Sequence, residues 1–195
     1  WIWILDRGKV VSWTEDGKPL KMFGTHTDVS ELKTLESELT QKNSFIKKVL
    51  DSIDVGIVVC DEHGKLTLFN EATLAIHGLD AEDIPHSEWA QYYQLLDSES
   101  LLPLTETEVP LYKAWKGESV VSQEMAIRHH NGQIILVETS GGPIQSNEGQ
   151  ILGAVVAMKD VTAKRHASAL IEKSERKFKG IFNSTFQFIG FLEPD

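Results

Sequence analysis

Gly24-Thr25-His26-Thr27-Asp28-Val29-Ser30 is the stretch that decides how this chain is organised, because a related stretch occurs a second time. The second copy is Ala157-Met158-Lys159-Asp160-Val161-Thr162. In both, a β-rich run ends at an aspartate and a long, charged helical pattern begins directly after it. Asp28 and Asp160 are 132 positions apart.

The offset of 132 positions extends outward on both sides of these stretches. It separates the turn glycines Gly17 and Gly149 upstream, and Asp51-Ser52 and Asn183-Ser184 downstream. An offset kept across a turn, a strand end, a helix and the next strand predicts a tandem array. We therefore predict five segments: the C-terminal part of one copy (1–29), a linker helix (30–50), a complete copy (51–162), a second linker helix (163–182) and the start of a third copy (183–195).

Composition narrows the class of protein. The net charge of −10 argues against nucleic acid as a partner, since that requires a basic surface. The one cysteine, Cys60, excludes an internal disulfide and suits a reducing compartment. No apolar run approaches the ~20 residues of a membrane span. We therefore expect a cytoplasmic fragment without membrane contact.

The stretch after Asp28 predicts a long amphipathic helix. The Asp28 carboxylate is placed to cap its first turn, and Glu31 completes a capping-box pattern. Apolar residues then recur at alternating steps of three and four, with one polar interruption. They are Leu32, Leu35, Leu39, Lys42, Ile46, Val49 and Ile53. The pattern has two interpretations: a parallel homodimer seam made by Leu32, Leu35, Leu39, Ile46 and Val49, or a helix that folds back on its own domain.

The complete copy reads as a mixed α+β domain. Strands are predicted at 55–60, 65–69, 119–128, 133–140 and 150–160, joined mostly by hairpin turns such as Asn131-Gly132. Asn70 is placed to cap a helix Glu71–His77, and Gly78 to end it. A second helix is predicted at Glu108–Lys116, and residues 80–104 as short helical turns and loop. This order favours an antiparallel sheet with helices on one face.

Several of these pieces resemble the PAS domains of bacterial sensory proteins. They are Asp61–Asn70 after a hydrophobic strand, the helix ending at His77-Gly78, Lys116-Gly117-Glu118, the Asn131-Gly132 hairpin, and Gly153–Thr162. Trp1–Val29 resembles the C-terminal half of such a domain, the PAC segment. The resemblance implies a five-stranded antiparallel sheet that cups a small pocket under its helices.

The resemblance also implies a signalling role for the junction residues Asp28, Asp160 and Thr162. They would pass changes in the shape of the sheet to the outgoing helix. The simpler alternative is that the two aspartates are only helix caps, each contributing about 1 kcal/mol to stability.

Cofactors known in the family need residues that are mostly missing here. Haem-binding members use a histidine on the helix before the third strand, and Glu108–Lys116 has none; His77, at the end of the first helix, would reach the pocket only by an unusual route. Photoactive flavin members use a cysteine in a helical Gly-x-Asn-Cys motif, whereas Cys60 is on a strand. The cofactor therefore stays unknown, with a non-covalent small molecule left open. Candidate pocket residues are Asn70, His77, Trp115 and Met125, of which Trp115 and Met125 also fit an ordinary core.

No constellation of residues predicts catalysis or a metal site. His129 and His130, as neighbours on a strand, would point to opposite faces and so would not chelate a metal. We therefore expect no enzyme activity in this fragment. The expected function is a sensory, relay and dimerisation module, acting with adjacent PAS domains on an output domain that is a histidine kinase or a GGDEF-type diguanylate cyclase. The alternative is a passive, ligandless dimerisation spacer.

Overall fold

A computed structural model describes residues 1–186 of the 195-residue chain. It divides into two compact units, Trp1–Val49 and Leu50–Asp195. Most of the predicted third copy, from residue 187 onward, lies outside the described residues. Within the described part of the chain, no helix is both long enough and apolar enough to cross a membrane.

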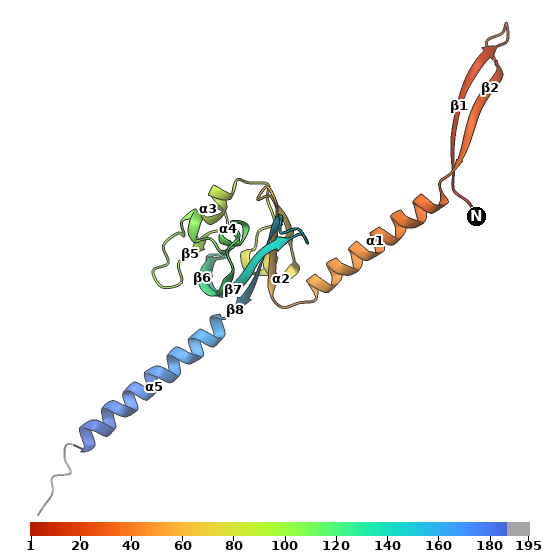
Figure 1. The fold of residues 1–195 in the computed structure, drawn as a ribbon. Helices are drawn as coiled ribbons and strands as arrows, with labels where there is room; N and C mark the ends of the chain where they lie inside the picture. Colours follow the sequence, from red (N-terminus) through yellow and green to blue (C-terminus); the bar gives the residue numbers. More distant parts are fainter. Residues whose placement is uncertain (187–195) are drawn as a thin grey trace, which may run out of the picture. The chain divides into compact units, whose positions relative to one another are not determined.

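The first unit consists of a hairpin and most of a helix (Figure 1). Strand β1 (Ile4–Trp13) pairs antiparallel with β2 (Pro19–Asp28) across a turn in which Gly17 has a φ of 76°. Such a left-handed backbone strongly favours glycine. Helix α1 (Ser30–Asp51) follows and contains no buried residue.

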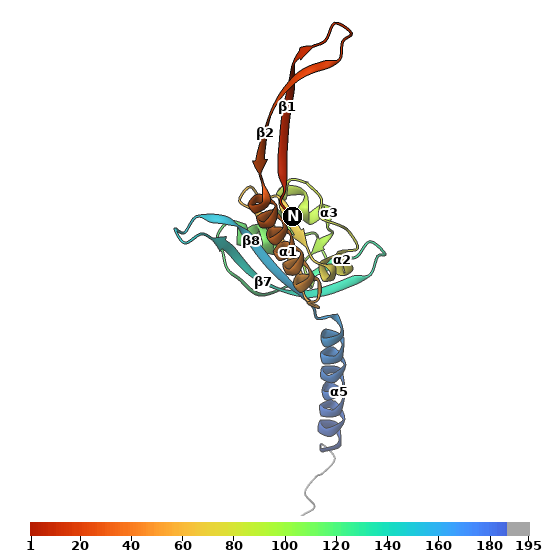
Figure 2. The same ribbon diagram turned by 90° about the vertical axis from the view of Figure 1, so that its right-hand side faces the viewer.

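The second unit is built on one antiparallel sheet with the strand order β4-β3-β8-β7-β6-β5 (Figures 1 and 2). Its strands are β3 (Gly56–Asp61), β4 (Leu66–Phe69), β5 (Leu95–Leu96), β6 (Val120–Arg128), β7 (Ile134–Gln145) and β8 (Ile151–Asp160). Its helical elements are α2 (Glu71–His77), the 3-10 turn η1 (His86–Glu88), α3 (Trp89–Tyr92), the 3-10 turn η2 (Glu106–Glu108), α4 (Pro110–Trp115) and α5 (Thr162–Phe186).

The predicted α+β architecture, an antiparallel sheet with helices, is confirmed, with one more strand than expected. The sixth strand, β5, lies in the stretch 80–104 that was predicted as turns and loop. It pairs with β6 through Leu95 and Leu96 alone. Two residues are too few to display the alternating pattern from which a strand is recognised.

Strand β7 is longer than the predicted 133–140. The Gly141-Gly142-Pro143 segment has the composition of a turn, yet it stays in the sheet and pairs with β8. The backbones approach so closely there that a Cβ added at Gly141 would lie 2.1 Å from the carbonyl oxygen of Val155. Glycine is therefore required at this position for packing and not for a turn.

His129 and His130 do not lie on a strand, so the expectation that they face opposite sides of the sheet is wrong. Strand β6 ends at Arg128, and the two histidines belong to the tight turn that includes Gly132, whose amide donates to the His129 carbonyl at 2.8 Å. Their ring centroids are 4.2 Å apart. Among the described residues there is no group of three or more His, Cys, Asp or Glu side chains placed to hold a metal.

Candidate functional site

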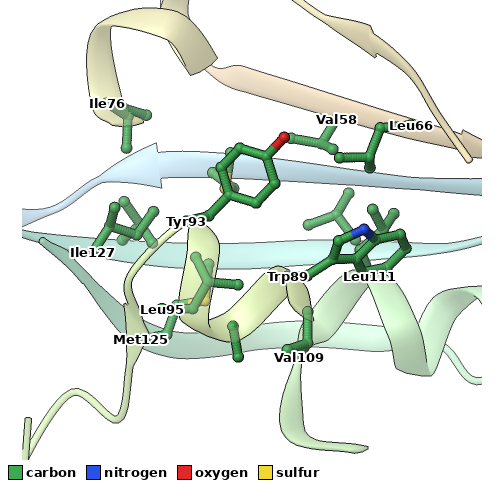
Figure 3. Packing of buried hydrophobic residues seen from close by; sticks show 14 of the residues in the cluster. Val58, Leu66, Ile76, Trp89, Tyr93, Leu95, Val109, Leu111, Met125 and Ile127 are labelled. Carbon is green, nitrogen blue, oxygen red and sulfur yellow. The ribbon is translucent and has the colours of Figure 1, made fainter. Parts of the chain in front are cut away.

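The core of the second unit contains a small cavity between the sheet and the helices α2, α3 and α4. Its volume is about 40 Å³. Side chains from β3, β4, β5, β6 and β8 form the sheet side of its wall, and residues of α2, α3, α4 and their flanks form the other. Figure 3 shows part of this packing, with Trp89 and Tyr93 between the helices and the strands.

His77, the last residue of α2, lines the cavity and is only 4% exposed. It needs no unusual route, because its ring packs directly against Phe69 and Tyr93, with centroid distances of 5.9 and 5.4 Å. Burial lowers the pKa of His77 to about 4, and the nearby His129 adds to this, while a hydrogen bond to the Tyr93 backbone acts in the opposite direction. The ring is therefore neutral at pH 7.

The Nδ1 atom of His77 has no hydrogen-bond partner among the described residues. In a neutral imidazole one ring nitrogen is a hydrogen-bond donor and the other is an acceptor.

Trp89 is another buried residue of the cavity wall. It is 2% exposed, it lines the same cavity, and its indole Nε1, which can only donate, also lacks a partner among the described residues. The hydroxyl of Tyr93 is fully engaged by contrast, since it accepts from the Glu82 amide at 2.9 Å and donates to the Asp80 carbonyl at 3.3 Å. Burial raises the pKa of Tyr93.

Of the other predicted pocket residues, Met125 lines the cavity and is 3% exposed. Trp115 is not among the lining residues. Its indole N–H donates to the Glu62 carbonyl at 3.1 Å, it packs near Gly64, and the Lys116 ammonium lies 3.9 Å from its ring centroid. Trp115 therefore holds α4 against the turn between β3 and β4.

Asn70 is also outside the cavity wall, although it is 1% exposed. Its Oδ1 accepts from the amides of Ile57 (2.8 Å) and Thr73 (3.1 Å) and from the Thr73 hydroxyl (2.8 Å). Its Nδ2 donates to the carbonyls of Leu50 and Val55, both at 2.9 Å. The predicted helix cap is thus also a clamp that joins the end of α1, β3 and α2.

The predicted junction at Asp160 is a compact set of hydrogen bonds around Leu136 of β7. The Asp160 carboxylate accepts a hydrogen bond at 2.8 Å from the amide of Thr162, the first residue of α5. The Thr162 hydroxyl accepts from the Leu136 amide at 2.9 Å, and the Val161 amide donates to the Leu136 carbonyl at 2.8 Å. The first turn of α5 is thereby fastened to the neighbouring strand.

A charge pair adds to this attachment. Arg165 of α5 pairs with Glu124 of β6, which stands directly opposite Glu138 of β7. Like charges on opposing strand positions destabilise a sheet unless a cation lies near them. Glu124 raises the pKa of Arg165 through hydrogen bonding and charge, with Glu138 contributing less.

The first unit has the same junction. The Asp28 carboxylate accepts a hydrogen bond from the Ser30 amide at 2.9 Å. Trp3 takes the place that Leu136 has in the second unit: its amide donates to the Ser30 hydroxyl at 2.8 Å, and its carbonyl accepts from the Val29 amide at 2.8 Å. Hydrogen bonds from Ser30 lower the pKa of Asp28. Sequence reasoning found Asp28, Asp160 and Thr162 but missed Trp3 and Leu136, because these two take part through backbone atoms that leave no side-chain signature.

The two hairpins also share their pairing register. In the β1–β2 hairpin Ile4 pairs with Asp28, and in the β7–β8 hairpin Val137 pairs with Asp160 in the same way. Four residues further along each hairpin, Gly8 pairs with Gly24 and Gly141 pairs with Val156. Equivalent positions in β2 and β8 are 132 residues apart, and equivalent positions in β1 and β7 are 133 residues apart. Each hairpin also has register shifts closer to its turn. The two hairpins therefore have a similar antiparallel register over the strand ends that precede α1 and α5.

The residues of the predicted seam lie along α1 and are exposed. Leu32, Leu35 and Leu39 are 56–61% exposed, and Ile46 and Val49 are 55% and 43% exposed. In α5 the apolar residues Ile171, Phe178 and Ile181 are exposed in the same way.

Comparison with known proteins places these features in context. A family model described as "PAS domain" matches residues 54–163. The chain is 27% identical over 135 residues to hybrid signal transduction histidine kinase I of Dictyostelium discoideum, aligning 65% of this chain and 7% of that protein. It is 24% identical over 151 residues to the probable diguanylate cyclase DgcE of Escherichia coli, an alignment that covers 77% of this chain and 13% of that protein. It is 28% identical over 170 residues to sporulation kinase E of Bacillus subtilis, an alignment that covers 86% of this chain and 21% of that protein.

The chain therefore spans between 7% and 21% of the length of these three relatives. Among solved structures, an RNA-binding light-oxygen-voltage receptor is 17% identical, with a TM-score of 0.49, covering 69% of this chain and 37% of that one. A PAS domain from Colwellia psychrerythraea is 19% identical, with a TM-score of 0.42, covering 64% of this chain and 98% of that one.

Proposed function

Since this chain belongs to the PAS domain family through residues 54–163, we propose that it is a sensory and relay module that controls an output domain through its linker helices. The observation that carries the proposal is the course of β8. Val156 and Met158 form part of the cavity wall, and Asp160 and Thr162, which hold the start of α5, follow two and four residues after Met158. A change in the core that moves β8 acts directly on the junction.

The junction is suited to transmit such a movement. The first turn of α5 is bound to β7 through Leu136 and to β6 through Arg165, so the helix follows the sheet instead of swinging freely. A small shift becomes a signal when a packed element has two discrete arrangements. We assign that role to pairs of linker helices from two copies of the chain, joined through Leu32, Leu35, Leu39, Ile46 and Val49 and through the weaker stripe in α5.

The proposal includes a tandem arrangement. Residues 1–29 are assigned as the C-terminal hairpin of another PAS domain, and 30–50 and 163–182 as linkers on either side of the complete domain, 51–162. Support comes from the shared register of the two hairpins and from their matching hydrogen bonds around Trp3 and Leu136. By analogy with the relatives, the output is a histidine kinase or a diguanylate cyclase. A cytoplasmic location is also part of the proposal, and the free thiol of Cys60 supports it.

A second candidate function is the passive spacer. The small volume of the cavity, about 40 Å³, favours it, because a closely packed core offers little room for a signal molecule. The two functions differ in whether the state of the core reaches α5.

Two matched substitutions test this without any ligand. Val109→Ile adds one methylene at the cavity wall, and Val120→Ile adds the same group at a buried position outside it. Amide hydrogen exchange measured by NMR reports on Leu136, which bonds Thr162, and on Arg165, whose amide donates to the Val161 carbonyl at 2.8 Å. A relay predicts altered exchange at both amides in Val109→Ile and little change in Val120→Ile. Unchanged exchange in Val109→Ile would reject the relay in favour of the spacer.

A further inference from the structure

Charged side chains follow one another across three neighbouring strands of the sheet, next to the start of α5. Glu124 of β6 stands directly opposite Glu138 of β7, and Glu138 stands directly opposite Lys159 of β8. Directly opposite residues of an antiparallel pair point to the same face, with Cβ atoms about 5 Å apart. Glu124, Glu138 and Lys159 therefore form a row on one face of the sheet, which we call the charge row.

Arg165, in the first turn of α5, binds the charge row at one end. Its guanidinium pairs with Glu124. Glu138 lies on the next strand, about 4.8 Å away in the direction across the sheet, and its charge also contributes to the raised pKa of Arg165. A guanidinium has five N–H donors, so the same side chain can bind either carboxylate. Two carboxylates on neighbouring strands are thus available to Arg165.

Glu138 requires a cation on one of its two sides. Glu124 repels it from β6, because like charges directly opposite each other destabilise a sheet, and Lys159 faces it from β8. The hydroxyl of Ser122 donates to the Glu138 carboxylate at 3.4 Å but carries no charge to offset the repulsion. Either Lys159 or Arg165 can supply that charge.

Lys159 connects the choice between these two cations to the core. Its neighbours along β8 are Met158, which lines the cavity, and Asp160, which accepts from the amide of Thr162 at the start of α5. A movement of β8 along its axis therefore shifts Lys159 relative to Glu138. Such a movement changes which cation faces the Glu138 carboxylate.

From these observations we infer that Arg165 is the positioning residue of α5 and has two alternative partners, Glu124 and Glu138. It binds Glu124 in the structure and moves to Glu138 when Lys159 no longer faces that carboxylate. The inference rests on the proposed relay and names the residues that give the start of α5 two discrete arrangements. The first turn of α5 stays bound to β7 in both, so the exchange of partners turns the helix across the sheet by up to one strand spacing, about 4.8 Å.

Paramagnetic relaxation measured by NMR tests the inference on the whole chain. A spin label on Ala169→Cys lies one turn after Arg165 and broadens the amide signals of nearby strands, while the buried native cysteine stays unlabelled. Glu124→Gln removes the first partner and should move the label toward β7, so that β7 amides broaden more and β6 amides broaden less. Glu138→Gln should keep the pattern of the natural chain, as should the control Glu148→Gln in the turn between β7 and β8.

Further variants separate a change of partner from a simple release of α5. Lys159→Gln frees Glu138 and should shift the relaxation pattern in the same direction as Glu124→Gln. The double variant Glu124→Gln/Glu138→Gln removes both partners and should raise amide exchange at Arg165 about 2- to 5-fold, the effect of losing an exposed ion pair. Each single variant should change this exchange little. Arg165→Lys keeps the charge and should retain the response to Glu124→Gln, which Arg165→Gln should lose.

Two results would overturn the inference. If Glu124→Gln gave the same relaxation pattern and the same exchange as the double variant, Arg165 would have one partner only. If Lys159→Gln left the pattern unchanged, Lys159 would not select between the partners. The relay test with Val109→Ile changes the core and leaves the charge row intact, so it stands or fails separately.

Discussion

Replacing Asn70 by alanine should strongly destabilise the second unit. The Asn70 side chain is 1% exposed and makes five hydrogen bonds, with Ile57, Thr73, Leu50 and Val55. Asn70→Ala leaves two amide donors and two carbonyl acceptors without these bonds. At about 1 kcal/mol for each net bond, and more where a group stays buried and unpaired, we expect a loss of about 3–5 kcal/mol.

A matched control is available in the same domain. Asn131 also accepts a backbone amide through Oδ1, from Gln133 at 2.9 Å, but it lies in an exposed turn. Asn131→Ala should therefore cost about 1 kcal/mol or less. Asn70→Asp keeps the acceptor oxygen but places a carboxylate oxygen against the Leu50 and Val55 carbonyls. This variant should therefore lose at least half as much free energy of unfolding as Asn70→Ala.

Urea unfolding followed by far-UV circular dichroism measures these differences, and an unchanged dependence on denaturant would show that the variants unfold from the same state. Asn70→Ala within 1 kcal/mol of Asn131→Ala would refute the clamp. An Asn70→Asp variant as stable as the natural chain would show that the bonds to Leu50 and Val55, and with them the attachment of the end of α1, contribute nothing.

Three further predictions concern other parts of the chain. The pKa of His77 is lowered to about 4 in the folded chain, so the unfolded chain takes up a proton on this residue first as the pH falls below 6.5. The free energy of unfolding should therefore fall between pH 6.5 and pH 4, by about 3 kcal/mol in full. Urea unfolding at pH 7 and pH 4.5 should show a smaller loss of stability on acidification in His77→Leu than in the natural chain. Burial raises the pKa of the Cys60 thiol to about 11, so the thiol should react with an aromatic disulfide reagent only after unfolding. A rapid reaction with the folded chain would contradict the packing of Cys60 in β3. Ile46 lies on the predicted seam, so Ile46→Lys should dissociate a dimer in analytical ultracentrifugation. Ser37 lies on the opposite face of α1, so Ser37→Lys should leave the dimer intact. A dimer that persists in both variants would show that the two copies meet through another surface.

Local patterns predicted the elements that depend on neighbouring residues. Asn70 and Gly78 mark the ends of α2 because capping requires particular residue types at fixed spacing, and the structure has both caps. The repeat of Asp28 and Asp160 likewise indicated two strand-to-helix junctions, and each aspartate accepts a hydrogen bond from the amide of the first residue of the helix.

Features that arise from contacts distant in sequence were not predictable in this way. The bonds from Asn70 to Leu50 and Val55 join residues 20 and 15 positions apart, and no local spacing encodes them. Trp89 was not singled out because it lies in the mixed stretch 80–104, and its burial depends on the strands and helices that pack around it.

The distance between the α5 helices of two copies tests the central claim most directly. A spin label on Ala169→Cys, on the face of α5 away from its apolar stripe, leaves the buried Cys60 thiol unmodified. Double electron–electron resonance then gives the distribution of distances between the two labels. The relay predicts that Val109→Ile, at the cavity wall, shifts this distribution while Val120→Ile leaves it in place. Identical distributions in both variants, with NMR showing that Val109→Ile has altered the core, would contradict the relay.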